Sequence, residues 1–578
     1  MKAKKSPEIP FLETHLHYFY KWEQEKPNGV FLRQPYGSKW REITWREAGD
    51  EARRIASALQ AMGVQKGSLV GLLSKNCAHW ILADLSILMC GAVCVPFYPN
   101  LAANDLSIVL EKSEVTHLFV GKLDPHYWES VRHVVPPSIR IIRFPDYPAS
   151  SLVRDGEAWD ELLKQYQPLK EAYSPKRSDL WTILYTSGTT GTPKGVMLEY
   201  RSPALFLEHE SRYREIGVFD LSEGRFFSYL PLNHIAERLA IELSCLVLGG
   251  TISFAESIET FPKNLQETQP TFFFGVPRIW QRFRLAVMER FGGEERYHRL
   301  IRLPILGSLL KRVIRRRLGL AKVELAVTGA AQTPDAVKLW FQELGIFVRD
   351  IYAMTENCAG CTVMPKDRNK LGTVGKPLKE VRLKIDEETG EVLMWADWVM
   401  KGYYKDPEKT AEVFRDGWLH TGDTGELDEE GFLRITGRLS DAFKTAKGLF
   451  VVPAPLEEPF ARLPYAEQVC VVGLGQVQPL VLLTLSEIGR KTDKTTVEQA
   501  ITKLLDEVNA PLPTYQKLAK AVLLSEIWSV ENSLLTPTLK VRRREIDKRY
   551  GPYYEEWLTR PEKVIWITEP LKEKVIQP

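Results

Sequence analysis

A repeated alternation between helix-like and strand-like stretches begins near Trp45 and runs through most of the sequence. Residues 45–62 and 78–91 carry apolar residues at helical spacing, whereas residues 69–73 and 92–96 are short apolar runs suited to buried strands. Such alternation is typical of layered α/β structures, because parallel strands need crossover helices that cover both faces of the sheet. We therefore expect an α/β fold built mainly on parallel sheets.

A change of pattern after Gly437 divides the chain. At 578 residues the sequence is too long for one ordinary hydrophobic core. Beyond residue 437 it turns to short strands and turns, a helix near residues 497–508 and a basic stretch at residues 540–549. We expect an N-terminal domain of residues 1–437 and a smaller C-terminal domain of residues 438–578.

Charge and cysteine content exclude some classes of protein. The formal net charge is +3, from 77 basic and 74 acidic residues, so no global field favours nucleic acid and we expect no nucleic-acid partner. Cys358 and Cys361 form a C-x-x-C pair, but no second pair accompanies them. We interpret them as structural thiols and expect a reducing, cytoplasmic location.

No stretch of the sequence predicts a membrane span. Residues 85–97 are too few to cross a bilayer, and residues 239–254 contain Glu242 and two glycines. Both stretches are therefore expected in the buried core.

One basic segment allows two interpretations. Residues 281–321 are expected to be helical, and the cations of residues 311–317 fall on one helical face. Val313, Ile314 and nearby leucines would form the apolar counterpart. The simpler interpretation is a solvated face packed on its own domain. The alternative is peripheral contact of residues 311–320 with an anionic membrane surface.

The most informative motif is a glycine- and hydroxyl-rich run, Tyr185-Thr186-Ser187-Gly188-Thr189-Thr190-Gly191-Thr192-Pro193-Lys194-Gly195. It follows an apolar, strand-like stretch and so leaves the edge of a sheet. Glycines let the backbone approach an oligophosphate closely, and hydroxyl and N–H groups donate to its oxygens. Lys194 adds a positive charge. The order of residues is not that of a Walker A loop.

Further motifs follow this run in order along the chain. They are Tyr229-Leu230-Pro231-Leu232-Asn233-His234-Ile235-Ala236-Glu237-Arg238, Phe274-Gly275-Val276-Pro277-Arg278-Ile279-Trp280, Thr328-Gly329-Ala330-Ala331, Tyr352-Ala353-Met354-Thr355-Glu356, Gly417-Trp418-Leu419-His420-Thr421-Gly422-Asp423, Gly431-Phe432-Leu433-Arg434-Ile435-Thr436-Gly437-Arg438 and Leu535-Thr536-Pro537-Thr538-Leu539-Lys540. Together with the first run they resemble the adenylate-forming enzyme superfamily over essentially the whole chain. The motifs that begin at Tyr229, Phe274 and Leu535 resemble long-chain fatty acyl-coenzyme A synthetases in particular.

This resemblance implies a fold and a reaction. The fold would be a large N-terminal α/β domain with mainly parallel sheets and a smaller β-rich part, plus a small, mobile α+β C-terminal domain. The reaction would join a fatty acid to coenzyme A through an acyl-AMP intermediate, with ATP and Mg²⁺ as cofactors. Two alternatives stay open: loading of an acyl carrier protein, and a lipid-binding pseudoenzyme. The oligomeric state is not predicted.

The resemblance also implies roles for individual residues. The β- and γ-phosphates would be held by Thr186, Ser187, Gly188, Thr189, Thr190, Gly191 and Lys194. Glu356 and the hydroxyl of Thr186 would bind Mg²⁺, since both offer hard oxygen ligands. Contacts to the rest of the nucleotide would come from Thr355 at the α-phosphate, from Gly329, Ala330 and Tyr352 around the adenine, and from Asp423 and Arg438 at the ribose.

Two residues would act on the reacting groups. Lys540 would relieve repulsion between the incoming carboxylate and the α-phosphate, and so would carry the first step. His234 lies in the motif that borders the acyl tunnel in the family. It would position the fatty acid, and a packed, hydrogen-bonded histidine is the competing interpretation.

Overall fold

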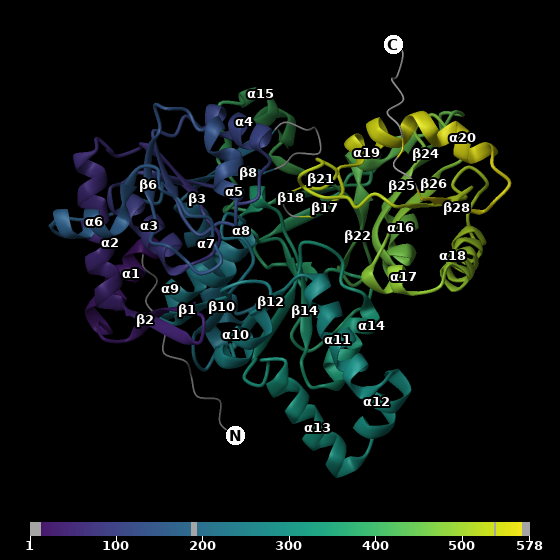
Figure 1. The fold of residues 1–578 in the computed structure, drawn as a ribbon, viewed down its shortest axis with the longest axis horizontal. Helices are drawn as coiled ribbons and strands as arrows, with labels where there is room; N and C mark the ends of the chain where they lie inside the picture. The colour runs from purple at the N-terminus through teal and green to yellow at the C-terminus, as the bar shows by residue number, and fades with distance from the viewer. Residues whose placement is uncertain (1–12, 187–192, 537–538, 569–570, 572–578) are drawn as a thin grey trace.

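Figure 1 shows the computed structural model, which describes residues 13–186, 193–536, 539–568 and 571. Several sheets are layered with helices, and the yellow-green C-terminal part occupies a region of its own. The α/β class expected from the sequence is confirmed.

The largest sheet contains the strand that leads into the glycine-rich run. Its eight strands lie in the order β19-β9-β8-β4-β3-β5-β6-β7. From β8 to β7 all neighbours are parallel, and β9 and β19 are antiparallel additions at one edge. The strands are β3 (Leu69–Leu73), β4 (Val93–Phe97), β5 (His117–Val120), β6 (Arg140–Arg143), β7 (Glu157–Ala158), β8 (Leu180–Thr186), β9 (Lys194–Glu199) and β19 (Gly402–Tyr403).

Local sequence explains why these elements form. The strand β4 is buried at every position, as expected of a parallel strand covered on both faces. Helix α2 (Trp45–Ala61) begins at a capping box, in which the Thr44 side chain accepts the N–H of Glu47 and the Glu47 carboxylate accepts the N–H of Thr44. Helix α3 (Ala78–Met89) is buried throughout, because it packs between α2 and the sheet. The helices and strands expected for residues 45–96 are therefore confirmed.

Two smaller sheets also have parallel centres. One has the order β12-β13-β14-β15-β16 and the other β10-β11-β1-β2, with parallel pairing except at β14/β15, β15/β16 and β1/β2. The first comprises β12 (Phe272–Gly275), β13 (Leu325–Thr328), β14 (Val348–Tyr352), β15 (Thr362–Val363) and β16 (Lys376–Pro377). The second comprises β10 (Arg225–Ser228), β11 (Thr251–Phe254), β1 (Val30–Tyr36) and β2 (Lys39–Thr44).

The β-rich part expected at the end of the N-terminal domain is an antiparallel sheet. Its strands are β17 (Arg382–Ile385), β18 (Glu391–Trp395), β20 (Phe414–Arg415), β21 (Trp418–Leu427) and β22 (Leu433–Arg438). Buried hydrophobic clusters of the preceding chain end at Leu419, and those of the following chain begin at Phe443. On this basis we retain the proposal that the chain divides close to Arg438.

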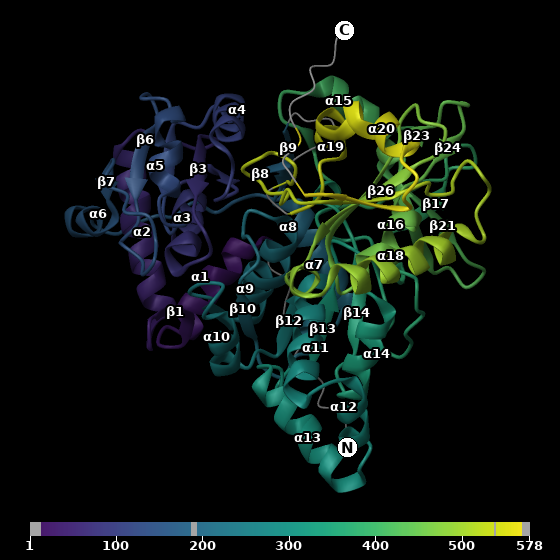
Figure 2. The same cartoon turned by 45° about the vertical axis from the view of Figure 1, so that its right-hand side comes forward.

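The C-terminal part is built on a four-stranded mixed sheet in the order β25-β26-β27-β28. Figure 2 shows helices α16 and α18 below this sheet and α19 and α20 above it. These elements are β25 (Ala466–Val472), β26 (Leu480–Leu485), β27 (Ala521–Leu524), β28 (Val564–Ile567), α16 (Ala454–Ala461), α18 (Lys494–Asn509), α19 (Arg543–Tyr550) and α20 (Tyr554–Thr559). The helix expected near residues 497–508 is confirmed as α18.

Most of residues 281–321 are helical, as expected, but the segment is divided. The structure has three helices there, α11 (Pro277–Phe291), α12 (Glu294–Ile301) and α13 (Pro304–Arg317). Gly292 and Gly293 both have positive φ angles and end α11, and Pro304 begins α13. Val313 and Ile314 also fail to share one apolar face, because Val313 is exposed and Ile314 is buried.

The apolar stretches at residues 85–97 and 239–254 lie in the buried core, as expected. Across the described ranges, no helix has both the length and the apolar character needed to cross a bilayer.

Candidate active site

The glycine-rich run connects two antiparallel strands at the edge of the large sheet. Thr186 ends β8, Lys194 begins β9, and the two residues are cross-strand partners. The ends of the run are therefore close together, as a phosphate-binding turn requires. Ser187, Gly188, Thr189, Thr190 and Gly191, to which the sequence assigns phosphate contacts, lie outside the described residues.

Lys194 lies near Glu356 and Tyr403. The Lys194 ammonium nitrogen is 5.3 Å from the centre of the Tyr403 ring, and the Tyr403 hydroxyl donates to Glu356 Oε1 (2.8 Å). Burial and the neighbouring Lys409 cation lower the pKa of Lys194, which the Glu356 carboxylate partly offsets. A cation and a carboxylate thus flank one tyrosine at the edge of the glycine-rich run.

Glu356 sits on a short turn that keeps its charge available. It belongs to the 3₁₀ turn η4 (Thr355–Asn357), which follows β14 and is fixed by the Asn357 side chain accepting the N–H of Met354 (2.9 Å). The preceding residue, Thr355, is buried. Within the described chain the half-buried Glu356 carboxylate enters no ion pair. Its charge is therefore free to bind a cation.

Asp423 is the centre of a second group of side chains. It accepts a hydrogen bond from the Tyr352 hydroxyl at Oδ2 (2.7 Å) and forms an ion pair between Oδ1 and Arg438 Nε (3.1 Å). Asp423 and Arg438 are direct neighbours on β21 and β22, which explains the pairing. Burial opposes the charge of Arg438, but the Asp423 carboxylate and, more weakly, the Glu356 carboxylate raise its pKa.

Gly329 and Ala330 follow β13 and border this site. A Cβ atom on Gly329 would come within 2.9 Å of the Ile351 carbonyl oxygen, so only glycine lets β13 approach β14 at this point. Ala330 adopts a positive φ of 67°. Gly329, Ala330 and Tyr352 are the residues for which the family resemblance implies contacts to the adenine.

Lys540 comes from the C-terminal part but reaches the same site. Its N–H donates to Thr536 Oγ1 (3.0 Å), and the bridge between Leu535 and Val541 closes the loop that carries it. Burial of the ammonium group and the Arg438 guanidinium lower the pKa of Lys540 to about 8, against the opposite effect of Asp423. The residue as a whole keeps an exposed surface. Lys540, Arg438 and Asp423 are therefore electrostatic neighbours.

His234 faces the same lysine from the N-terminal part. Burial and the Lys540 cation lower the pKa of His234 to about 4, so the ring is neutral at physiological pH. Its Nδ1 accepts the N–H of Ala236 (3.2 Å). Because a backbone N–H can only donate, the remaining ring proton belongs on Nε2. His234 can therefore donate a hydrogen bond to a carboxylate.

The loop that carries His234 is fastened from both sides. The Asn76 amide donates to the Leu230 carbonyl (2.5 Å) and accepts the N–H of Leu232 (3.0 Å). Glu237 Oε1 accepts from the Tyr229 N–H (3.0 Å) and from the Ser228 hydroxyl. The Asn76 and Glu237 side chains are both buried, so their hydrogen bonds restrict the position of the loop.

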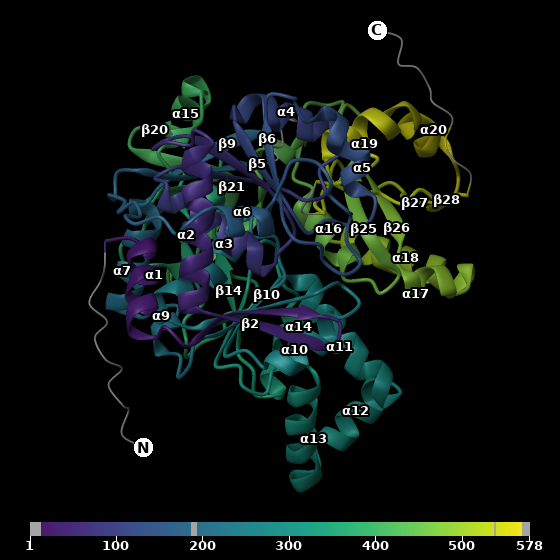
Figure 3. The same cartoon turned by 60° about the vertical axis from the view of Figure 1, so that its left-hand side comes forward.

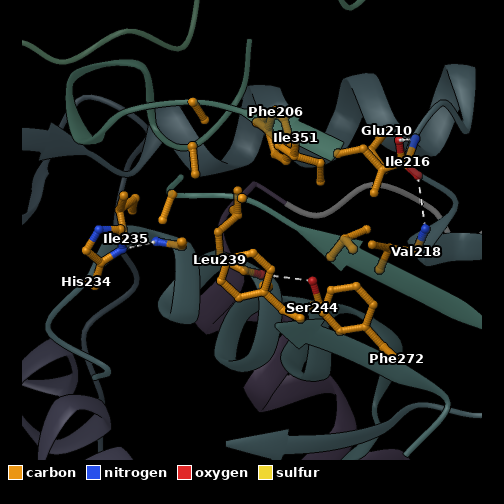
Figure 4. A pocket seen from close by; sticks show the side chains of 18 of the residues that line it. Phe206, Glu210, Ile216, Val218, His234, Ile235, Leu239, Ser244, Phe272 and Ile351 are labelled. Carbon is orange, nitrogen blue, oxygen red and sulfur yellow. Dashed lines mark hydrogen bonds between the residues drawn. The ribbon is translucent and has the colours of Figure 1, made fainter. Parts of the chain in front are cut away.

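An apolar pocket opens beside His234 (Figure 4). Its atom-free volume, including the opening to solvent, is ≈ 750 Å³, and most of the side chains that line it are apolar. Such a lining suits an alkyl chain. Figure 4 shows His234 at one end and Glu210, Ile216 and Val218 at the other.

The far end of the pocket contains a carboxylate that the sequence did not predict. Glu210 accepts hydrogen bonds from the N–H groups of Ile216 (2.9 Å), Gly217 (2.5 Å) and Val218 (3.1 Å), and burial raises its pKa. Tyr403 was also missed, because it lies far from Glu356 in the sequence and its contact arises only when β19 joins β9.

Cys358 and Cys361 are buried free thiols. Burial raises their pKa values. No group of three or more His, Cys, Asp or Glu side chains suited to a metal ion occurs in the described segments. The interpretation of these cysteines as structural thiols stays a prediction.

Two family models match the chain. The model described as AMP-binding enzyme matches residues 19–404, and the model described as AMP-binding enzyme C-terminal domain matches residues 441–557. Residues 405–440, which include the strand that contributes Arg438, lie between the two matches.

Individual proteins agree with these matches. Fatty acyl-CoA synthetase A of Dictyostelium discoideum is 31% identical over 89% of this chain and 85% of its own length. Long-chain-fatty-acid–CoA ligase 5 of Rattus norvegicus is 29% identical over 90% and 84%, respectively. Among solved structures, o-succinylbenzoate coenzyme A synthetase of Bacillus subtilis, in complex with ATP and magnesium ion, superposes with a TM-score of 0.69 at 22% identity, covering 92% of this chain and 99% of that chain.

Proposed function

The chain belongs to the AMP-binding enzyme family, and from that premise we propose that it is a long-chain fatty acid–coenzyme A ligase. It activates the fatty acid with ATP as acyl-AMP, and it then transfers the acyl group to the thiol of coenzyme A. The relatives that match most of the chain carry names for this activity. Their names favour coenzyme A over an acyl carrier protein as the acceptor.

The observation that carries this proposal is the position of Lys540. Its ammonium group lies in the electrostatic neighbourhood of Arg438 and Asp423 on one side and of His234 on the other. His234 lines the end of the apolar pocket. A fatty acid lying in the pocket with its carboxylate at His234 would therefore meet a nucleotide bound at Asp423 next to a positive charge.

In the proposed first step, a carboxylate oxygen of the fatty acid attacks the α-phosphorus of ATP. A bond forms between this carboxylate oxygen and the α-phosphorus. The bond from the α-phosphorus to the oxygen that bridges it to the β-phosphate breaks, and pyrophosphate leaves with that electron pair. Lys540 offsets the negative charge shared by the two approaching anions. The Nε2–H of His234 would hold the second carboxylate oxygen and so orient the attack.

In the second step, the sulfur of coenzyme A attacks the acyl carbonyl carbon. A carbon–sulfur bond forms, the bond from that carbon to the AMP oxygen breaks, and the thiol proton is released. AMP is a far better leaving group than oxide, which is why the first step is needed. The acyl-adenylate thus links the two half-reactions.

Nucleotide binding is assigned to the residues on both sides of the glycine-rich run. Thr186 and Lys194 at its ends would hold the β- and γ-phosphates together with the run itself. Thr355 would contact the α-phosphate. The ribose hydroxyls fit Asp423, whose carboxylate is already oriented by Arg438 and Tyr352.

The residues present fit a magnesium ion. Glu356 is a half-buried carboxylate without an ion-pair partner among the residues described, and Thr186, at the end of β8, offers a hydroxyl. Carboxylate and hydroxyl oxygens, completed by phosphate oxygens, are ligands that Mg²⁺ prefers. When bound, the ion would neutralise phosphate charge.

A panel of saturated fatty acids from medium to very long chain length tests the proposed function. We expect fatty acid-dependent exchange of pyrophosphate into ATP, and formation of the matching acyl-coenzyme A in the complete reaction. Exchange without thioester would leave an adenylate-forming enzyme with a different acceptor. Absence of exchange with every acid would contradict the proposed activity.

A further inference from the structure

Helices α11, α12 and α13 form a projection that extends away from the rest of the molecule. Figures 1, 2 and 3 show it below the sheets in three views, with α13 reaching its lower end. The projection is inserted between β12 and β13. Both strands line the apolar pocket, through Phe272, Phe274 and Val327.

Helix α13 has one buried face and one exposed apolar face. Gly307 and Ile314 are buried, and they face the body of the projection. On the opposite side lie Ile305, Leu309 and Val313, at spacings of four residues, with exposed fractions of 87%, 55% and 47%. Exposed apolar side chains that gather in this way usually mark an interaction surface.

The same helix is strongly cationic. From residue 296 to residue 322 the sequence contains nine lysines and arginines and no carboxylate. Arg302, Arg312, Arg316 and Arg317 are exposed and form no ion pair within the described ranges. The nearest preceding carboxylate with a partner, Glu294, is bound to Arg284 (2.6 Å). The positive charge at the end of the projection is therefore uncompensated.

We propose that residues 302–317, here called the docking tip, bind the surface of an anionic lipid bilayer. Ile305 and Leu309 would enter the boundary between headgroups and acyl chains, and the arginines would meet lipid phosphates. At 14 residues α13 is too short to span a bilayer, so contact is confined to one surface.

The combination of charge and apolar side chains selects this partner. In a symmetric interface between two copies of the chain, each docking tip would face the same unpaired arginines, which repel each other. A nucleic acid would bind the arginines but would leave the exposed isoleucine and leucine side chains in water. An anionic membrane satisfies both features at once.

Docking would serve the proposed function, on which this part of the inference rests. Long-chain fatty acids partition into bilayers, because their alkyl chains are costly to hydrate. Contact through the docking tip would hold the enzyme at the phase that contains its substrate. The strands at the base of the projection would then keep the apolar pocket near that phase.

Co-sedimentation of the full chain with phospholipid vesicles tests the proposal. We expect binding to phosphatidylcholine vesicles that contain phosphatidylglycerol, weaker binding to pure phosphatidylcholine, and release at high salt. The double variant Ile305→Glu/Leu309→Glu should bind the anionic vesicles more weakly than the wild type, by roughly tenfold at least. The control Ile488→Glu/Ile527→Glu makes the same change of charge at two exposed isoleucines of the C-terminal part and should bind like the wild type.

Loss of vesicle binding in both double variants, or in neither, would overturn the proposal that the docking tip binds the membrane. The proposal would also be overturned if the wild-type protein did not bind anionic vesicles but self-associated through Ile305 and Leu309, as measured by light scattering. Fatty acid-dependent pyrophosphate exchange, with acid supplied in water, separates this inference from the proposed function. Both variants should keep that exchange. Vesicle binding without exchange in the wild type would contradict the function and leave the docking tip standing.

Discussion

The pKa of Lys540, lowered to about 8 by burial and by Arg438, connects the first half-reaction to pH. A lysine whose pKa is lowered is charged below that pKa and neutral above it. The charge that relieves repulsion between carboxylate and phosphate is therefore lost as the pH rises through about 8. Burial keeps His234 neutral down to about pH 4, so it does not titrate in the same range.

We predict that kcat/KM for pyrophosphate exchange falls about tenfold per pH unit above pH 8, since kcat/KM reports the free enzyme. The variant Lys540→Arg is the control, because a guanidinium stays protonated throughout this range. Its residual exchange activity should lack the alkaline fall. The same fall in both proteins would show that another group titrates.

At the residue scale the sequence supplied candidate side chains for the site, but it did not predict how they contact one another. Asp423, Arg438 and Tyr352 were each expected near the nucleotide, and their hydrogen bond and ion pair appear only in the folded chain. Tyr403 and Glu210 carry no signal in the sequence. A tyrosine before a turn and a glutamate in an amphipathic helix are ordinary residues until tertiary contacts place them.

At the scale of elements, the chain after His234 is held by a buried group of charges. It continues as α8 (Ile235–Glu237) and then as a π-helical turn η3 (Arg238–Leu243), which is an uncommon geometry that often lies at functional sites. Arg238 is fully buried and pairs with Asp84 (2.6 Å) and Glu242 (2.9 Å). Burial raises the pKa of Glu242, which disfavours the charged form of that carboxyl.

We predict that Asp84→Ala lowers the free energy of unfolding by about 3–5 kcal/mol, because it removes one of the two carboxylates that pair with the buried Arg238 cation. Glu242→Gln keeps the shape and removes a carboxyl whose charged form is already disfavoured by burial, so its cost should be smaller. Urea denaturation of the two variants measures this difference. Equal stabilities for Asp84→Ala and the wild type would contradict the assigned role of the ion pair.

Helical and strand periodicity was enough to predict β3, β4 and β8 of the large sheet and the helices α2 and α3, since buried parallel strands and their covering helices have simple patterns. Over residues 281–321 it predicted helix correctly for most positions, but it did not predict the breaks that Gly292, Gly293 and Pro304 introduce. The extra segments pack against one another, and a helix-helix contact leaves little trace in a local pattern. The mixed pairing of the C-terminal sheet was also not predicted.

At the scale of the whole molecule, the described parts of the chain show ion pairs that join the N-terminal and C-terminal parts. Arg542 Nη2 lies 2.9 Å from Asp105 Oδ2, and Arg278 Nη2 lies 2.6 Å from Glu467 Oε1. Arg542 is two residues from Lys540, and the first pair is the less exposed of the two. These contacts favour the arrangement in which Lys540 reaches the site.

We predict that Asp105→Ala slows pyrophosphate exchange by roughly two- to fivefold, since one partly exposed ion pair contributes about 1 kcal/mol or less. Reaction of supplied acyl-AMP with coenzyme A should change less. Glu467→Ala, at the more exposed pair, is the matched control and should have the smaller effect. If Asp105→Ala impaired both half-reactions equally, the contact would have only a general role in stability.

The central claim is that one lysine from the C-terminal part allows the fatty acid carboxylate to approach the α-phosphate of the nucleotide. The direct test is Lys540→Ala, assayed separately for pyrophosphate exchange and for conversion of supplied acyl-AMP to acyl-coenzyme A. We predict that exchange falls by about a hundredfold or more, as for loss of a charge that acts on the transition state, while conversion of acyl-AMP is largely retained. Equal loss of both half-reactions, or retention of exchange, would contradict the account.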